Sequence, residues 1–476
     1  MAERYEAVVV GAGPGGYVAG IRLGQHGKKA LVLERENLGG VCLNWGCIPS
    51  KALIHAGNLR HEIHHFGPVF SAVPDLDATA LQKWKNGVID KQRKGIGQLL
   101  KSAGTAHEFA DAKIVGPNTL RIERDGEARE VEFDNLILAT GARVIEIPGF
   151  PFSDELIGYA RDAVDYDPIP KKLVVIGGGI IGSELGMAYR KMGAEVTIVE
   201  MMDQVLPGTD KDLVRPVAKA MKQAGIEVLT KAKAKSYTRD SDVAKVEVET
   251  EKGETRTLEA DRVLVAVGFR PNTESLGLDA AGVTLTDEGW VEVDRHCRTN
   301  VPHIYAIGDL TGPPLLAHRA SHMGEVAAEV ICGKPAAFDV MAMPLGVFTD
   351  PEVAQAGLTE EEAKAKGYNV RSGAFPMSAL GRAGAMNATE GLVKVVVDAD
   401  TDVVLGVGIT AFNACDLIAE ACLAIEMGAL AEDLSLTVHV HPTLSEGLME
   451  AAKVAREEPL HIPKKPKRDR PRAKAS

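Results

Sequence analysis

The stretch Ala7-Val8-Val9-Val10-Gly11-Ala12-Gly13-Pro14-Gly15-Gly16 joins a short apolar run to a cluster of glycines. We expect residues 8–10 to form a buried strand and a helix to follow the glycines through Leu23. A second apolar run, residues 30–33, ends at the acid Glu34. Strand, glycine turn, helix and a second strand ending in an acid are the parts of a dinucleotide-binding unit.

The same pattern returns between residues 173 and 200. Leu173-Val174-Val175-Ile176 precedes Gly177-Gly178-Gly179-Ile180-Ile181-Gly182, a helix is expected to about Met192, and residues 196–199 end at Glu200. In each copy the first glycine permits a tight turn, the second admits a pyrophosphate, and the third lets helix and strand pack closely. These positions are Gly11, Gly13 and Gly16 in the first copy and Gly177, Gly179 and Gly182 in the second. One such motif is weak evidence, but two complete copies predict an α/β chain with two dinucleotide-binding units.

The acid at the end of the second strand predicts which nicotinamide cofactor binds. A carboxylate at Glu200 would hydrogen-bond a free ribose hydroxyl and repel a 2′-phosphate, so we expect NAD rather than NADP. Arg190 and Lys191 are close in sequence, but we interpret them as solvated residues on the surface of the preceding helix.

Cys42 and Cys47 lie just after the first unit, in Gly40-Val41-Cys42-Leu43-Asn44-Trp45-Gly46-Cys47-Ile48-Pro49-Ser50-Lys51. Two buried, unreactive thiols would be the ordinary interpretation. Residues five apart point roughly 140° away from each other on a regular helix, so a bridge needs an irregular turn, for which Gly46 has the freedom. Pro49 favours a helix that starts near Cys47 and stabilises its thiolate. The segment therefore predicts a redox disulfide that faces a flavin.

Length, charge and cysteine content fit an enzyme of this kind. The 476 residues allow roughly three domains, and the net charge of −12 disfavours a nucleic-acid partner. The other four of the six cysteines show no close spacing, which is typical of a reducing compartment. The first apolar run leads straight into the glycines, so we expect no cleavable signal. Because no apolar run reaches ~18 residues, we expect a cytoplasmic protein without a membrane span.

Further segments suggest where a cofactor meets the backbone. Residues 136–141 and 263–268 read as buried strands that end in glycine turns. Residues 304–307, before Gly308 and Asp309, read as another buried strand with an acidic end, and the alternative for Asp309 is a helix or turn cap. The polar region 50–102 looks helical, and from about Pro344 the pattern is that of a mixed α/β domain. His61, His64 and His65 have helical spacing, but a solvated helix face is preferred over a metal site, so no metal is predicted.

On these residues the chain resembles the FAD-dependent pyridine nucleotide-disulfide oxidoreductases (class I), and within them the dihydrolipoyl dehydrogenases, from Val8 to about Glu450. The C-terminal anchor is His439-Val440-His441-Pro442-Thr443-Leu444-Ser445-Glu446. The resemblance implies two Rossmann-like FAD- and NAD-binding domains plus a C-terminal α+β dimerisation domain. The expected boundaries are 1–147 (FAD, first part), 148–270 (NAD), 271–343 (FAD/central, second part), 344–460 (interface) and 461–476 (basic disordered tail).

The resemblance also assigns site residues. It implies that the first glycine motif binds FAD, with Glu34 on its ribose, Lys51 near the flavin and paired with Glu184, Asp309 on the ribityl chain and Ala317 at the isoalloxazine. Thr140 and Gly141 belong to the same cofactor site. The second motif is expected to bind NAD, with Gly268 on the nicotinamide side. Trp45 departs from the family pattern, in which many members carry a small aliphatic residue.

His441 and Glu446 form the expected acid–base pair. An imidazole titrates near neutrality, so His441 can take a proton from a substrate thiol while Glu446 orients the ring and stabilises the imidazolium. His439 is interpreted as part of a turn. In the family this dyad comes from the partner subunit, which implies an obligate homodimer.

The expected reaction is oxidation of protein-bound dihydrolipoamide to lipoamide through Cys42 and Cys47 and FAD, with hydride transfer to NAD+. A substrate thiol would attack Cys42, leaving Cys47 as the thiolate beside the flavin. The chain would then be the E3 component of 2-oxoacid dehydrogenase or glycine-cleavage complexes, which bear lipoyl domains. The rival interpretations are a glutathione- or trypanothione-type reductase, a mercuric reductase, which would carry a second cysteine pair near its C-terminus, and a flavoprotein that mainly docks into an assembly.

Overall fold

The computed structural model describes residues 3–464, apart from the side chain of Pro68. The chain divides into two compact units. Unit 1 comprises the residues up to Pro207 together with Ala224–Asp339, and unit 2 comprises Gly208–Gln223 together with the residues from Val340 on. The predicted basic tail lies, from residue 465 on, outside the described residues.

The first sheet of unit 1 is parallel, with β1 as its central strand. An antiparallel ribbon is attached to this sheet through β6. The parallel strands lie in the order β3-β2-β1-β6-β17, and the first half of β6 also pairs with β5, which pairs with β4. The strands are β1 (Glu3–Val10), β2 (Ala30–Glu34), β3 (Ala106–Phe109), β4 (Asp111–Gly116), β5 (Thr119–Arg124), β6 (Glu127–Leu138) and β17 (Ile304–Ala306). The apolar runs at residues 8–10 and 30–33 are therefore neighbouring buried strands, as predicted.

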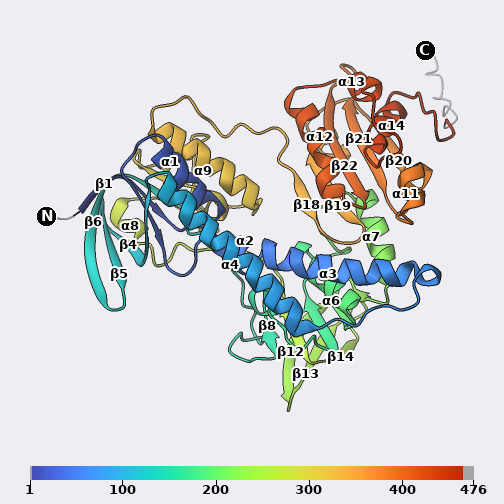
Figure 1. Ribbon diagram of the computed structural model, residues 1–476, viewed down its shortest axis with the longest axis horizontal. Coiled ribbons are helices and arrows are strands. Elements are labelled where there is room, and N and C mark those ends of the chain that lie inside the picture. The colour runs from blue at the N-terminus through green and yellow to red at the C-terminus, as the bar shows by residue number, and fades with distance from the viewer. Residues whose placement is uncertain (1–2, 465–476) are drawn as a thin grey trace, which may run out of the picture. The chain divides into compact units, whose positions relative to one another are not determined.

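Helix α1 (Pro14–Gln25) follows β1 and packs against α9 (Ala317–Ile331), as Figure 1 shows. Small residues make this approach possible, because a Cβ on Gly15 would lie 2.7 Å from the carbonyl oxygen of Ala320. A Cβ on Gly324 would likewise lie 2.4 Å from the carbonyl oxygen of Gly15. The two helices thus touch through their backbones.

The second sheet of unit 1 repeats the design of the first. All its strands are parallel, in the order β11-β10-β9-β15-β8, and helix α6 (Ile180–Met192) follows β9 as α1 follows β1. The strands are β8 (Ile157–Gly158), β9 (Lys172–Ile176), β10 (Glu195–Val199), β11 (Glu227–Leu229) and β15 (Arg262–Val265). An antiparallel sheet lies between β11 and β15 in the chain, with strands β12 (Lys233–Asp240), β13 (Val243–Glu249) and β14 (Thr255–Ala260).

Smaller elements connect these layers. They are α2 (Gly40–Asn44), α5 (Ala160–Ala163), α8 (Leu278–Ala281), the 3₁₀ helices η1 (Gly67–Val69) and η2 (Gly308–Thr311), and the antiparallel pair β7 (Ala142–Val144) and β16 (Phe269–Pro271).

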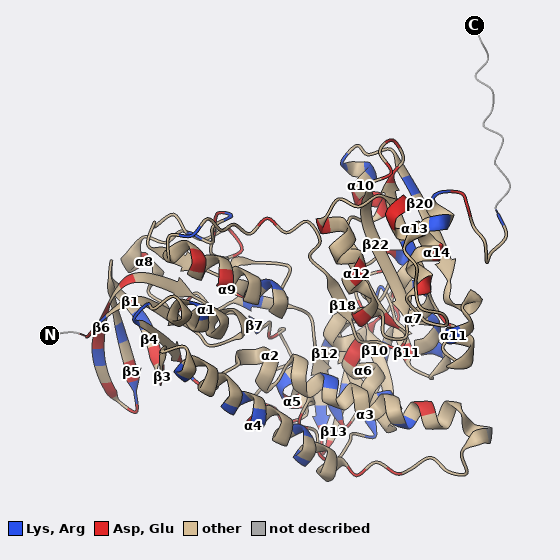
Figure 2. Ribbon diagram, turned by 45° about the horizontal axis from the view of Figure 1, so that its top comes forward, with Lys and Arg blue, Asp and Glu red and all other residues tan. Residues whose placement is uncertain are grey.

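The polar region between the glycine motifs forms two long helices, α3 (Cys47–His65) and α4 (Ala78–Ser102). Helix α4 buries an apolar stripe that includes Ile89 and Ile96, and Lys and Arg recur along its remaining surface (Figure 2). One lysine departs from this pattern, because Lys85 is buried and its ammonium donates to the carbonyl oxygen of Val164 at 2.7 Å.

Unit 2 is built on an antiparallel sheet of order β18-β19-β22-β21-β20. Its strands are β18 (Leu345–Val347), β19 (Glu352–Gly357), β20 (Val370–Pro376), β21 (Leu392–Asp398) and β22 (Val404–Ala411). Its helices are α7 (Lys211–Gln223), α10 (Glu360–Ala365), α11 (Gly381–Ala385), α12 (Ala414–Glu426), α13 (Ala431–Leu436) and α14 (Glu446–Ala455), with η3 (Met377–Ala379). Alternate residues of a strand face opposite sides of a sheet. Val407 and Ile409 therefore join the apolar core with α12 and α14, whereas Gly408 and Thr410 contact Leu213 of α7.

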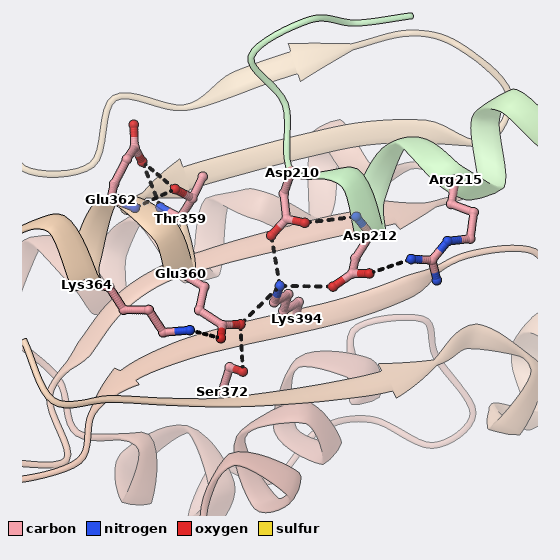
Figure 3. Close-up of polar contacts among 9 residues, drawn as sticks. All are labelled: Asp210, Asp212, Arg215, Thr359, Glu360, Glu362, Lys364, Ser372 and Lys394. Atoms are coloured by element: carbon pink, nitrogen blue, oxygen red, sulfur yellow. Dashed lines mark hydrogen bonds and ion pairs between the residues drawn. The ribbon is translucent and has the colours of Figure 1, made fainter. Parts of the chain in front are cut away.

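An ion network centred on the buried Lys394 lies on the α7 side of this sheet (Figure 3). The ammonium of Lys394, on β21, lies 2.9 Å from Asp210, 3.1 Å from Asp212 and 3.3 Å from Glu360, and its side chain is only 9% exposed. Burial of a lysine is tolerated where several carboxylates compensate the lost hydration. These contacts raise the pKa of Lys394 against the opposing effect of burial. The network ties Gly208–Gln223 to the sheet of unit 2.

The predicted α/β fold class, with two Rossmann-like sheets and a C-terminal α+β domain, is confirmed by this architecture. Among the described residues, no helix combines the length and apolar character that a membrane crossing requires.

Candidate functional site

The two glycine turns of unit 1 have the same backbone geometry. Gly11 has a φ of +101° and Gly177 a φ of +103°, in the region that favours glycine. A Cβ on Gly11 would lie 2.3 Å from the carbonyl oxygen of Ala139, and one on Gly177 would lie 2.4 Å from that of Ala266. Any other residue at either position would push the strand ends apart.

The third glycine of each motif lies where the helix passes closest to the turn. A Cβ on Gly16 would lie 1.8 Å from the carbonyl oxygen of Gly11, and one on Gly182 would lie 1.9 Å from that of Gly177. These contacts are the close helix–strand packing that the fingerprint requires.

The second glycine of each motif faces open space. A Cβ on Gly13 would meet no atom nearer than 4.0 Å, and one on Gly179 would meet none within 4 Å. Each is the N-cap of its helix, α1 or α6, and neither helix N-terminus is capped by a side chain. Uncapped amides at a helix N-terminus bind anions. Both turns therefore fit the pyrophosphate of a dinucleotide.

Glu34 and Glu200 are held in matching positions. Glu34 accepts the backbone N–H of Ala12 at 2.8 Å, and Glu200 accepts that of Gly178 at 2.6 Å. The second carboxylate oxygen of each accepts the N–H two residues further along the chain, at 2.9 Å for Glu34 and 2.7 Å for Glu200. Both carboxylates are thus fixed beside a glycine turn.

The interpretation of Arg190 and Lys191 as solvated surface residues is wrong. The guanidinium of Arg190 donates to the carbonyl oxygens of Ala224 and Ala194, and Lys191 is 7% exposed with its ammonium 2.6 Å from Asn58 Oδ1. Helical position alone did not reveal that this end of α6 is covered by other segments of unit 1.

Two reciprocal hydrogen bonds join the segment after β6 to the segment after β16. Thr140 donates its hydroxyl to the carbonyl oxygen of Asn272 at 3.0 Å, and the Asn272 amide donates back to the carbonyl oxygen of Thr140 at 2.9 Å. Gly141 and Gly268 both have positive φ, and the N–H of Ile145 donates to the Gly268 carbonyl oxygen at 3.0 Å.

Asp309 lies in η2, and Ala317 is the first residue of α9. Burial raises the pKa of Asp309 to about 6, although the positive charge of Arg319 opposes that shift. Arg319 is itself buried and donates to the carbonyl oxygen of Gly312 at 2.7 Å. Asp309 is therefore a partly desolvated acceptor, a character suited to a hydroxyl ligand.

Cys42 and Cys47 lie on either side of a tight turn, Cys42 in α2 and Cys47 at the first position of α3. A Cβ on Gly46 would lie 2.9 Å from the carbonyl oxygen of Val41, so the expected irregular turn depends on glycine. Both cysteines are thiols in the structure. A hydrogen bond from Cys42 and the charge of Lys51 lower the pKa of Cys47, whereas the same hydrogen bond and burial raise the pKa of Cys42. The two thiols are chemically unequal.

Lys51 follows Cys47 by one helical turn on α3. Its ammonium lies 2.7 Å from Glu184 Oε2, on α6, and the Glu184 side chain is 3% exposed. The cation is thus held by a buried carboxylate that comes from the second glycine unit.

His441 and Glu446 come together in unit 2. His441 Nδ1 lies 2.9 Å from Glu446 Oε1, and Glu446 Oε2 accepts the backbone N–H of Thr443 at 2.8 Å. Burial would raise the pKa of Glu446, but the hydrogen bonds from Thr443 and His441 outweigh it and the pKa is lowered. The imidazole is 78% exposed, so Nε2 is free to meet a substrate.

His439 has a second role that its sequence position did not reveal. Its Nε2 lies 2.9 Å from Glu420 Oε1, its Nδ1 lies 2.9 Å from the carbonyl oxygen of Thr437, and its side chain is 6% exposed. It therefore anchors the segment that leads to His441 onto α12, rather than only forming a turn. The spacing of residues 420 and 439 contains no signal for this pair.

The histidines of α3 do not form a metal cluster. His61 and His65 stack with ring centroids 5.9 Å apart, and no group of three or more metal-ligating side chains is found in the described chain.

Two family models cover most of the chain. Residues 5–324 match "Pyridine nucleotide-disulphide oxidoreductase", and residues 343–452 match "Pyridine nucleotide-disulphide oxidoreductase, dimerisation domain".

Curated relatives match over nearly the full length. The dihydrolipoyl dehydrogenase of Geobacillus stearothermophilus is 47% identical over 459 residues, 96% of this chain and 97% of the relative. That of Haloferax volcanii is 45% identical over 466 residues, 97% of this chain and 98% of the relative.

Solved structures share the fold. LpdA from Mycobacterium tuberculosis has a TM-score of 0.86 at 29% identity, covering 95% of this chain and 99% of that one. The HOCl-induced flavoprotein disulfide reductase RclA from Escherichia coli has a TM-score of 0.85 at 25% identity, covering 94% of this chain and 100% of that one.

Proposed function

We propose a function for this chain on the premise that it belongs to the pyridine nucleotide-disulphide oxidoreductase family. It is an FAD- and NAD-dependent oxidoreductase that converts dihydrolipoamide to lipoamide, the activity named for its relatives. The observation that carries the proposal is the unequal pair Cys42 and Cys47 in a chain that matches those relatives over nearly its full length.

Cys42 is the sulfur that exchanges with substrate. A dihydrolipoamide thiolate attacks Cys42 in the Cys42–Cys47 disulfide, a mixed disulfide forms, and Cys47 leaves as a thiolate. The second substrate thiolate then attacks the substrate sulfur of the mixed disulfide, which releases lipoamide and leaves the enzyme as a dithiol. The lowered pKa of Cys47 supports this assignment, because a stable thiolate is the better leaving group.

His441 is the base that removes the substrate proton and later returns it. Its Nδ1 contact with Glu446 favours the tautomer that leaves Nε2 as the acceptor, and the carboxylate stabilises the imidazolium that forms. The exposure of the imidazole supports a role toward a thiol presented from outside its own unit.

FAD, when bound, carries the electron pair from the dithiol to NAD+. Gly11, Gly13, Gly16, Glu34, Lys51, Thr140, Gly141, Asp309 and Ala317 would hold FAD, and Gly177, Gly179, Gly182, Glu200 and Gly268 would hold NAD. Glu184 would fix Lys51 beside the flavin, since it already binds that ammonium. The open space at the second glycines and the matching carboxylates support both sites.

The working protein is a homodimer, in which His441 and Glu446 of one subunit serve the cysteines of the other. The match of residues 343–452 to the dimerisation domain supports this assembly. Large apolar side chains are also exposed on unit 2, namely Leu423, Met427, Leu436, Val438 and Val440. The partner class is the lipoyl domain of an acyltransferase or H-protein, and the sparse cysteines support a cytoplasmic location.

Steady-state assays test the proposal. We expect NADH-dependent reduction of lipoamide, little reduction of glutathione disulfide, and a higher Michaelis constant for NADPH than for NADH. Cys42→Ser and Cys47→Ser should each abolish lipoamide turnover, whereas Cys332→Ser, at a partly exposed cysteine outside the pair, should retain it. Normal turnover by Cys47→Ser, or a preference for glutathione disulfide, would refute the assignment.

A further inference from the structure

We infer that Trp45, Arg161 and Glu36 form a clamp that positions the turn between Cys42 and Cys47 and thereby strengthens the disulfide. The clamp rests on the proposed function only in that this pair is the redox centre.

Trp45 is part of the turn itself. It is the C-cap residue that follows α2, and its backbone N–H donates to the carbonyl oxygen of Val41 at 3.0 Å. The next residue, Gly46, packs so closely on Val41 that no side chain fits there. Whatever holds the indole of Trp45 therefore holds the backbone that separates the two sulfurs.

Arg161 holds that indole. Its guanidinium carbon lies 4.2 Å from the centroid of the Trp45 ring, within the range of a cation–π contact. Arg161 comes from α5, which lies between strands β8 and β9 of the second sheet, and is remote from Trp45 in sequence. The contact joins two separate segments of unit 1.

Glu36 fixes the guanidinium over the ring. Its two carboxylate oxygens contact Arg161 through both terminal nitrogens, one of them at 3.4 Å. The backbone N–H of Glu36 donates to Glu34 Oε1 at 2.9 Å, and Glu34 Oε2 accepts the N–H of Ala12. The clamp is thus continuous with the acid and glycine turn of the first dinucleotide unit.

Holding the turn favours disulfide formation for an entropic reason. Closing the ring requires the Cys47 thiolate to attack the sulfur of Cys42 in a mixed disulfide, and a pre-ordered turn keeps the two sulfurs at a high effective concentration. With glutathione, the balanced exchange is protein dithiol plus glutathione disulfide giving protein disulfide plus two glutathione. Loosening the turn lowers the equilibrium constant of this exchange.

The equilibrium constant is measured on the FAD-loaded protein in glutathione redox buffers, by trapping free thiols with an alkylating reagent and weighing the protein. We expect Trp45→Val and Arg161→Met each to lower the constant by about two- to fivefold, the effect of one cation–π contact at a partly exposed site. The double variant should fall no further than either single variant, because both remove the same contact. Trp45→Phe and Arg161→Lys keep a ring or a cation. Their equilibrium constants should lie between those of Trp45→Val and Arg161→Met and that of the unchanged protein.

Two controls make the result specific. Trp84→Val changes a half-exposed tryptophan of α4, and Arg239→Met removes an exposed ion pair with Asp154 and Glu155, so neither should change the constant. Unchanged constants in both single variants, or effects that add in the double variant, would overturn the clamp. Because this exchange uses no lipoamide, the clamp can fail while lipoamide turnover stands, and loss of turnover in the unchanged protein would refute the proposed function alone.

Discussion

Replacing Glu446 with glutamine removes the charge that faces His441 while keeping the size of the side chain. In the structure, this carboxylate accepts from His441 Nδ1 at 2.9 Å and from the N–H of Thr443 at 2.8 Å. A glutamine can satisfy only one of these donors with its oxygen, and its amide then points a donor at the other. The imidazolium formed during catalysis also loses its counter-charge.

The size of the effect follows from the interaction that is lost. A hydrogen bond to a charged group contributes about 1.5–3 kcal/mol, which corresponds to a fall in rate of about 10- to 150-fold. The fall should appear in kcat for dihydrolipoamide oxidation. The imidazolium of His441 exists only after His441 has taken the substrate proton, so Glu446 stabilises it during turnover and not before the substrate binds. Binding of NAD+ should be unaffected, since Glu446 lies in unit 2 and the second glycine motif lies in unit 1.

The assay compares dihydrolipoamide oxidation with NADH oxidation by a small one-electron acceptor, which needs no thiol base. We expect Glu446→Gln to lose the first activity and keep the second. Glu390→Gln, at an exposed carboxylate of unit 2 paired with Lys219, is the matched control and should keep both. A loss of less than about threefold in the first activity would contradict the charge-assisted role that the geometry assigns to Glu446.

Other positions give independent outcomes. Gly182→Ala should abolish NADH binding with FAD retained, because its Cβ would lie 1.9 Å from a carbonyl oxygen of the same turn; Gly95→Ala, in open space on α4, is the control for a binding titration. Glu420→Gln should lower lipoamide kcat about three- to tenfold at constant KM for NADH, since it loosens the charged hydrogen bond to His439; steady-state kinetics that show no change would exclude the anchoring role. The pKa of Glu360 is lowered to about 2, chiefly by its hydrogen bond with Lys364, so its stabilisation is present above the unfolded value of 4.5 and lost as pH falls toward 2. In urea unfolding, the free energy of unfolding of the unchanged protein should fall by about 2 kcal/mol from this source between pH 4.5 and about 2. Glu360→Gln should lack this contribution.

The parts of the fold that the sequence predicted are those that local chemistry decides. The tight turns at Gly11 and Gly177 need positive φ and a close backbone approach, which only glycine allows. The glycines in the sequence therefore show where these turns lie. The buried strands around them are short apolar runs rich in Val, Leu and Ile. The unlike thiols of Cys42 and Cys47 also follow from local features, the hydrogen bond between them and the charge of Lys51 one helical turn after Cys47.

Tertiary structure decided which distant side chains meet. Arg190 and Lys191 looked like solvated helix residues, yet other segments of unit 1 cover them. Lys394 stands in a valine-rich strand, and its three carboxylates come from segments far away in the chain. Helical and strand periodicity show that a residue lies on a given face, but not what covers that face, because packing between elements depends on the whole chain. The sequence by itself therefore determined the two glycine turns and the close pair Cys42 and Cys47, and only the tertiary structure decided which distant charged and aromatic side chains meet.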